Sequence, residues 1–246
     1  MGYLVLQGGS EFGGRMRVSD LRAIELAGGR DATLAIVPAA AAPDGNHRRA
    51  GQNGSKWFRM LGARDVTVSR LVDRQSADDP DVASGLQRSR LVYLLGGFPG
   101  YLAGVLQGSA GWRAILAALA EGGVLAGSSA GAMVLGDFFY DPVSRSLVKG
   151  LGLLRAIRII PHFNSFGRAW VGRLQNELPS VILIGIDEET GMINDGPGGT
   201  WSVYGAGAVV LYRGHQPERY GDGERIELDR SPIYDPSGNG RARNIG

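Results

Sequence analysis

The first half of the chain alternates short apolar runs with segments of helical character. Such continuous runs are typical of strands buried on both faces of a parallel sheet, and they occupy residues 3–7, 33–38, 66–72, 91–95 and 124–126. Between them the sequence predicts helices at 19–27, 44–62, 79–89 and 99–121, the first with Ser19 as its N-cap. This alternation predicts an α/β fold built on a doubly wound, mostly parallel sheet with right-handed crossovers.

The second half of the chain is richer in strand patterns. It predicts helices at 130–138 and 166–178, and extra strands at 153–160, 181–186, 201–213 and 224–228. A length of 246 residues suits one large domain, which we place at 1–228. Residues 229–246 are polar and contain Pro and Gly, so they are predicted to form a tail with little core content.

Composition argues against several classes of function. The chain contains no cysteine, and its histidines are isolated, so we predict no metal and no cofactor. The net charge is +2 and the arginines are scattered, which does not favour a nucleic-acid partner. The chain shows neither a signal-peptide pattern nor an apolar run of membrane-spanning length. The expected location is therefore the cytoplasm, with no membrane partner.

Glycine-rich segments follow three of the predicted strands, at 8–14, 96–99 and 127–131. Because the carboxyl ends of parallel strands meet at one edge of a sheet, we expect these segments to lie together there. The last of them fits G-x-S-x-G with Ser129 at its centre, a turn that can hold a nucleophilic serine in a strained, exposed conformation. Taken alone, the pattern fits an ordinary glycine-rich turn equally well.

A serine nucleophile needs a base within hydrogen-bond reach, and the chain has three histidines. His162 directly follows a predicted apolar strand, which places it at the same edge as Ser129. His47 lies in a charged segment expected to face solvent, and His215 lies in a predicted turn. We therefore favour His162 as the base.

The base needs an acid to orient it, and three carboxylates follow the strand at 181–186. Period-two alternation puts Asp187 and Glu189 on one face and Glu188 on the other, and this pattern alone does not choose among them. A tetrahedral intermediate also needs N–H donors for its oxyanion. The amide of Ala130 follows the nucleophile, and Gly97 is the best second candidate.

Several of these segments together carry a resemblance. Residues 127–132, Gly-Ser-Ser-Ala-Gly-Ala, are similar to the nucleophile turn of the serine-peptidase family that contains dipeptidase E (aspartyl dipeptidase) and cyanophycinase. His162-Phe163 with Arg168 downstream, the Gly-Ile-Asp-Glu strand end at 185–188 and the Gly-Gly pair at 96–97 resemble other family segments in the same order.

The resemblance implies a flavodoxin-like fold akin to class I glutamine amidotransferases, with serine in place of cysteine as nucleophile. It implies a Ser-His-Glu triad of Ser129, His162 and Glu188, and so selects Glu188 among the three acids. It also implies a small peptide substrate, either an aspartyl dipeptide or β-aspartyl-arginine.

The sequence departs from the family pattern near the expected substrate site. Phe98-Pro99 stands where the family usually has a polar pair ending in Gln, so Phe98 is a candidate substrate contact that puts aspartyl specificity in question. No arginine stands four residues after His162. Arg168 and Arg173 are the arginines left to hold a substrate carboxylate.

Two alternatives remain open at this point. An α/β-hydrolase-type esterase or amidase would use Ser129 with an acid before its base, in the order Ser, acid, His, which requires His215. A non-catalytic member of the fold would instead bind a small ligand at the same edge. In either case the chain is expected to be a monomer or a homodimer.

Overall fold

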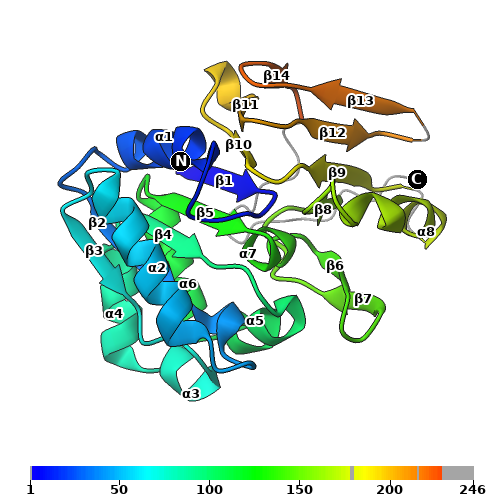
Figure 1. Cartoon of the computed structure of the whole chain (residues 1–246). Coiled ribbons are helices and arrows are strands. Elements are labelled where there is room, and N and C mark those ends of the chain that lie inside the picture. The colour runs from blue at the N-terminus through cyan, green and yellow to red at the C-terminus, as the bar shows by residue number, and fades with distance from the viewer. Residues whose placement is uncertain (1, 178–179, 215, 229–246) are drawn as a thin grey trace.

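An eight-stranded sheet forms the centre of the computed structural model, which describes residues 2–177, 180–214 and 216–228 (Figure 1). Its strand order is β14-β11-β10-β1-β5-β4-β2-β3. Five of these strands are parallel: β1 (Tyr3–Gln7), β2 (Thr33–Val37), β3 (Asp65–Val68), β4 (Leu91–Leu94) and β5 (Val124–Ser128). Three antiparallel strands extend it: β10 (Thr190–Ile193), β11 (Trp201–Gly205) and β14 (Arg225–Ile226). The predicted mostly parallel sheet with extra C-terminal strands is confirmed.

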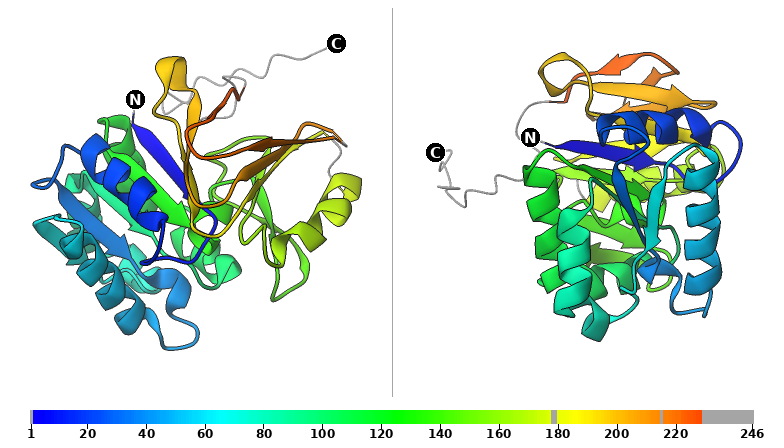
Figure 2. Two further views of the ribbon diagram at one scale, coloured as in Figure 1. Left: turned by 45° about the horizontal axis from the view of Figure 1, so that its top comes forward. Right: turned by 90° about the vertical axis from the view of Figure 1, so that its left-hand side faces the viewer.

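Helices cover both faces of this sheet, as the edge-on view of Figure 2 shows. One face buries apolar side chains of α1 (Met16–Leu26) and α2 (His47–Met60). The other face packs against α4 (Pro80–Arg88), α5 (Pro99–Leu106) and α6 (Ala110–Ala120). Short helical turns complete this half: η1 (Ala39–Ala41), α3 (Arg74–Ala77) and α7 (Ala130–Met133). The apolar strands are therefore buried on both sides, as their continuous hydrophobic runs predict.

A second, four-stranded sheet in the order β13-β12-β9-β8 lies beside the first (Figure 1). Its strands are β8 (Ile157–Ile160), β9 (Ile182–Ile186), β12 (Val209–Tyr212) and β13 (Pro217–Tyr220). A hairpin and three further helical pieces complete the second half: β6 (Phe138–Asp141), β7 (Ser146–Lys149), η2 (Gly167–Trp170), α8 (Val171–Glu177) and η3 (Pro197–Gly199). The parallel pair β8 and β9 matters for function, because both strands end toward the candidate site.

The single helix predicted at 99–121 is wrong, because α5 and α6 are separate and meet at 86°. Gly108 takes φ +69°, a left-handed conformation that glycine adopts without a Cβ penalty. The side chain of Ser109 then caps α6 by accepting the Trp112 N–H at 3.0 Å. The apolar periodicity runs through both helices, so periodicity alone could not reveal the break.

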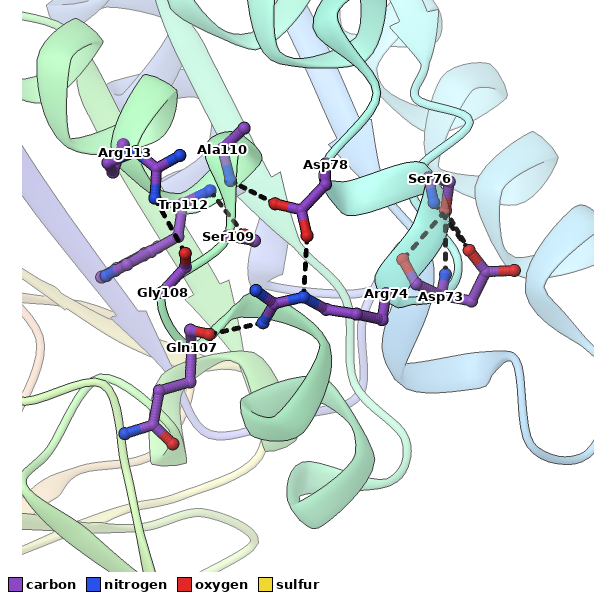
Figure 3. A network of polar contacts seen from close by, with 10 residues as sticks. All are labelled: Asp73, Arg74, Ser76, Asp78, Gln107, Gly108, Ser109, Ala110, Trp112 and Arg113. Carbon is purple, nitrogen blue, oxygen red and sulfur yellow. Dashed lines mark hydrogen bonds and ion pairs between the residues drawn. The ribbon is translucent and has the colours of Figure 1, made fainter.

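Side chains from α3 and its C-terminal end hold this break in place (Figure 3). Asp78 accepts the N–H of Ala110 at 2.8 Å, a bond that also lowers the pKa of the Asp78 carboxyl. Arg74 pairs with Asp78 at 2.8 Å and donates to the Gln107 carbonyl at 2.6 Å. The last carbonyls of α5 and the first amides of α6 thus find partners where the helix is interrupted.

Three other local predictions also differ from the structure. Ser19 is not an N-cap, because α1 begins at Met16 and the Ser19 hydroxyl is buried inside the helix, donating to the Met16 carbonyl at 3.1 Å. The helix predicted at 130–138 ends at Met133 and gives way to the β6–β7 hairpin. The predicted strand 201–213 is two strands in different sheets, interrupted where Gly205 takes φ +135°.

Among the residues described, no single helix combines the length and apolarity needed to cross a membrane; only the bent pair α5 and α6, taken together, reaches both. The same residues hold no group of three or more metal-ligating side chains arranged around a common point. The predicted tail at 229–246 lies outside the described residues.

Candidate active site

Ser129 lies in the turn between β5 and α7 with φ 49° and ψ −113°. A non-glycine residue rarely takes such angles, and this conformation costs about 1–3 kcal/mol. Glycines make the turn possible, since a Cβ on Gly127 would lie 2.5 Å from the Gly131 carbonyl oxygen, and one on Gly131 would lie 2.3 Å from that of Leu94. The Ser129 N–H donates to the Gln7 carbonyl of β1 at 3.0 Å. The turn therefore has the strained geometry of a nucleophile elbow.

His162 follows β8 and brings its Nε2 to 2.9 Å from the Ser129 Oγ. It too has a positive φ, 50°, and its N–H donates to the Gly8 carbonyl at 2.7 Å. A Cβ on Gly9 would lie only 2.2 Å from the His162 Cε1. The glycine pair after β1 thus leaves space for the imidazole. The sequence pattern marked these glycines as a strand-end loop but did not indicate this role.

Glu188 follows β9 and places its Oε1 2.7 Å from the His162 Nδ1. In this arrangement Nδ1–H donates to the carboxylate, which leaves Nε2 free to accept the serine proton. The Glu188 N–H donates to the Asn164 side chain at 2.9 Å, which holds the strand end against the loop after His162. The three side chains form the relay that proton transfer from a serine requires.

The other two acids at this strand end point elsewhere. Asp187 is buried and accepts the Ala208 N–H at 2.9 Å. Glu189 takes φ 54° and accepts the Arg15 N–H at 3.4 Å. Glu188 is thus separated from Asp187 and Glu189, although β9 itself ends at Ile186, before all three acids.

The predicted oxyanion donors are the backbone amides of Gly97 and Ala130, which follow the ends of β4 and β5. Within the described part of the chain, neither the Gly97 nor the Ala130 N–H donates to a protein acceptor. The Gly96 N–H, in contrast, donates to the Oε1 of Glu11 at 3.1 Å. Gly97 has φ 139° and passes so close to Ala40 that a Cβ would lie 2.3 Å from its carbonyl oxygen, so only glycine fits there.

A cavity of about 450 Å³ opens in front of the Ser129 hydroxyl. Its lining comes from the ends of β1, β4, β5 and β8 and from α2 and the β6–β7 hairpin: Glu11, Phe12, Ala41, Asp44, Asn46, Ala50, Asn53, Leu95, Gly96, Gly97, Pro99, Ser129, Met133, Pro142, Pro161, His162, Phe166 and Trp170. The three glycine-rich segments therefore meet at one edge, as predicted.

The predicted substrate contacts lie outside this lining. Phe98 is the N-cap residue of α5, and its side chain is half-buried. The residues on either side of Phe98, Gly97 and Pro99, line the cavity instead. The Arg168 guanidinium lies over the Phe163 ring at 5.3 Å, and Arg173 pairs with Glu177 at 2.7 Å. Their role in binding a carboxylate remains a prediction.

Other cavity residues carried no clear signal in the sequence. Phe166 stacks on the His162 ring at 4.9 Å with 51% of its surface exposed, and Trp170 follows at 5.6 Å from Phe166. Glu11 comes from the loop after β1, and Asp44 from the segment before α2. Aromatic and acidic residues are common on protein surfaces, so only the fold shows that these share a cavity with Ser129.

A buried polar cluster lies beneath the serine turn. Asp20 accepts the Gln7 side-chain amide and the Trp57 indole N–H, both at 2.7 Å, and the Gln7 side chain in turn accepts the Tyr93 hydroxyl. Burial raises the pKa of Asp20 from its ordinary 3.8 to about 7, against the opposing effect of the two donors. The cluster fixes Gln7, whose carbonyl holds the Ser129 N–H.

We expect Asp20 to make stability depend on pH. Between pH 3.8 and about 7 the folded protein holds a proton on Asp20 that the unfolded chain has lost. Stability therefore falls as pH rises through this window, by about 1.4 kcal/mol per pH unit. Urea unfolding of the wild type and Asp20→Asn tests this, since the variant lacks the titrating group.

The Asn side chain cannot accept both donors, so the variant should be the less stable protein at about pH 5. That deficit should shrink by roughly 2 kcal/mol on going to about pH 7. Asp31→Asn, the same change at an exposed ion pair, is the control and should keep the wild-type profile. An Asp20→Asn profile parallel to the wild type would contradict the pKa assignment.

The fold and the serine turn define an α/β serine hydrolase, and comparison with known proteins identifies its family. Residues 4–198 match the model of peptidase family S51. The chain belongs to this family and is a serine peptidase.

Cyanophycinases are among its relatives. The chain is 30% identical over 224 residues to a cyanophycinase of Synechococcus elongatus, covering 85% of this chain and 67% of that protein. It is also 30% identical over 202 residues to a cyanophycinase of Trichormus variabilis, covering 75% and 64%. The matches thus span about two thirds of these relatives' length.

Solved structures agree with the fold. A peptidase from an acI-B1 actinobacterium superposes with a TM-score of 0.82 at 30% identity, covering 93% of this chain and 97% of that one. A candidate peptidase E of Listeria monocytogenes EGD-e gives a TM-score of 0.57 at 18% identity, covering 92% and 100%. The second likeness concerns the fold alone.

Proposed function

We propose that the chain hydrolyses small peptides through Ser129, His162 and Glu188. Two consecutive hydrogen bonds support this proposal. The Ser129 Oγ lies 2.9 Å from the His162 Nε2, and the His162 Nδ1 lies 2.7 Å from the Glu188 carboxylate. His162 takes the serine proton as Oγ attacks the scissile carbonyl, and Glu188 stabilises the imidazolium that forms. His162 then protonates the leaving amine, and water, deprotonated by His162, releases the acyl group.

The amides of Gly97 and Ala130 are the proposed oxyanion donors. Both are free of protein acceptors among the described residues, and Ala130 directly follows the nucleophile. Donors held rigidly before the reaction stabilise the developing charge without reorganisation. The positive φ and close backbone contact of Gly97 provide that rigidity.

Among aspartyl peptides, the cavity favours β-aspartyl-arginine over acidic or neutral aspartyl dipeptides. Glu11 and Asp44 line it, whereas no lysine or arginine is found among its described lining residues. A guanidinium group is complementary to such a surface, and the aromatic faces of Phe166 and Trp170 can add cation–π contacts. Cyanophycinases among the relatives support the same choice.

Among the described residues, the contacts of Ser129 favour a peptidase of this family over the esterase alternative. His162 already occupies the position next to Ser129 that a base must take, and the order along the chain is Ser, His, Glu. His215, which the esterase needs, lies outside the described residues.

Hydrolysis of a peptide panel tests the proposed function. The panel contains β-aspartyl-arginine, α-aspartyl dipeptides, neutral dipeptides and a p-nitrophenyl ester, and a fluorophosphonate probe reports separately on Ser129. We expect the probe to label Ser129 and β-aspartyl-arginine to be cleaved fastest. Labelling with ester cleavage alone would reject the peptide substrate, and a folded protein that is not labelled would favour the ligand-binding alternative.

A further inference from the structure

Three successive backbone carbonyls at the end of β1 each accept the N–H of one segment of the catalytic relay. The bonds run from Ser129 to Gln7 at 3.0 Å, from His162 to Gly8 at 2.7 Å, and from Glu189, next to Glu188, to Gly9 at 3.2 Å. The three donor residues have positive φ angles of 49°, 50° and 54°. Such conformations persist only where the surrounding contacts fix them. One short segment therefore sets the relative positions of three segments that lie far apart in the chain.

This segment, Gln7–Gly9, is itself firmly held. Gln7 pairs with Ser128 of β5 on one side and with Gly191 of β10 on the other. Its side chain is fully buried in the polar cluster beneath the serine turn. The Gly8 N–H donates to the Thr190 carbonyl at 3.0 Å. The segment is thus a fixed support for the residues that are bonded to it.

Gly9 lies against the part of the His162 ring that carries both nitrogens of the relay. A Cβ at Gly9 would be 2.2 Å from the ring Cε1, 2.7 Å from Nε2 and 2.8 Å from Nδ1. A methyl group at this position and the imidazole cannot occupy their places together. The ring is the end of a side chain, so rotation about the His162 side-chain bonds can relieve the clash while the backbone keeps its fold. The relay would then be broken, because Nε2 and Nδ1 would leave their partners.

From this geometry we propose that Gln7–Gly9 is the positioning element of the catalytic relay, and that Gly9 is a positioning residue that keeps the His162 ring between Ser129 and Glu188. The proposal rests on the proposed function of these three side chains. Gly9 is not among the described residues that line the cavity, so it acts through His162 and not through the substrate.

Substitution of Gly9 by Ala in the full-length chain tests the proposal. Gly28→Ala is the matched control: Gly28 also has φ 112°, but a Cβ there would meet no other described atom within 4 Å. Both variants therefore carry the same unfavourable φ, and only Gly9→Ala clashes with the imidazole. The measurements are kcat and KM for the best peptide of the panel and the rate of fluorophosphonate labelling. The labelling is repeated with each substitution in a His162→Ala background.

We expect Gly9→Ala to lower kcat and the labelling rate by about 100-fold or more, with KM within about threefold of the wild type. Gly28→Ala should stay within about twofold in every measurement. In the His162→Ala background the methyl group has no ring to displace, so Gly9→Ala should change the remaining labelling rate by less than about twofold. A crystal structure of Gly9→Ala should show Nε2 out of hydrogen-bond distance of the Ser129 Oγ.

An equal labelling loss from Gly9→Ala with and without the imidazole would overturn the positioning role, because a general distortion of the serine turn acts in both backgrounds. Activity of Gly9→Ala at the level of Gly28→Ala, or an unmoved His162 ring in its crystal structure, would also overturn it. If Gly9→Ala does not fold, the double variant with His162→Ala must fold, since it lacks the clash; an unfolded double variant would contradict the proposal.

The proposed function fails in a different way. A folded wild type that the probe does not label would reject Ser129 as nucleophile, and labelling of His162→Ala at the wild-type rate would reject His162 as base. Neither result depends on residue 9, so the two failures are separate outcomes.

Discussion

Replacing Ser129 by Ala is expected to abolish fluorophosphonate labelling and to lower kcat by at least about four orders of magnitude. Removal of Oγ leaves His162 without the proton that it would accept at 2.9 Å. Among the described lining residues Ser129 is the only serine, so we expect no other serine to replace it as nucleophile. The measurement is steady-state hydrolysis of the best substrate in the panel.

Ser128→Ala is the informative comparison for this variant. Ser128 is the neighbouring residue, fully buried at the end of β5, and it lies outside the cavity lining. Activity should therefore persist in Ser128→Ala and disappear in Ser129→Ala, with both proteins folded by circular dichroism. Loss confined to Ser128→Ala, or activity retained in Ser129→Ala, would remove Ser129 from the mechanism.

Replacing Glu188 by Gln should lower kcat by about two to four orders of magnitude. The variant should fold like the wild type, as judged by circular dichroism. The carboxylate accepts the His162 Nδ1–H at 2.7 Å and so keeps Nε2 free to take the serine proton. A Gln amide can donate to Nδ1 instead, which puts the proton on Nε2 and blocks the transfer. It also lacks the negative charge that stabilises the imidazolium.

Glu189→Gln is the matched control, since it makes the same chemical change one residue away. The Glu189 carboxylate accepts the Arg15 N–H at 3.4 Å and does not contact His162, so kcat should remain within about twofold of the wild type. Equal losses in both variants would show that the strand end responds to charge in general. Loss in Glu189→Gln alone would reject Glu188 as the orienting acid.

Prediction from sequence succeeded where a feature depends on local patterns. The parallel strands β1, β2, β4 and β5 appear as apolar runs with polar residues only at strand ends, because both faces of their central positions are buried. The segments at the strand ends are rich in glycine because backbone there passes close to other backbone, as at Gly131.

Prediction failed where contacts with distant parts of the chain interrupt a local sequence pattern. The periodicity at 99–121 is helical throughout, yet Asp78 and Arg74 from another element support a break at Gly108. The segment 201–213 has a single strand pattern, but β11 pairs with β10 and β12 pairs with β9 in a different sheet. Such choices depend on partners far along the chain, which no local pattern contains.

The same distinction between local patterns and distant contacts applies to the residues of the candidate site. The sequence by itself determined the candidates Ser129, His162 and the acids at 187–189, because each follows a strand pattern whose end must lie at one edge of a sheet. The family resemblance of the strand end at 185–188 favoured Glu188 among these acids, and the tertiary structure shows its carboxylate beside the His162 ring. Only the tertiary structure shows that Glu11 shares the cavity with Ser129. Side-chain directions beyond a strand end depend on backbone angles such as φ 54° at Glu189, and these are fixed by packing between segments more than a hundred residues apart.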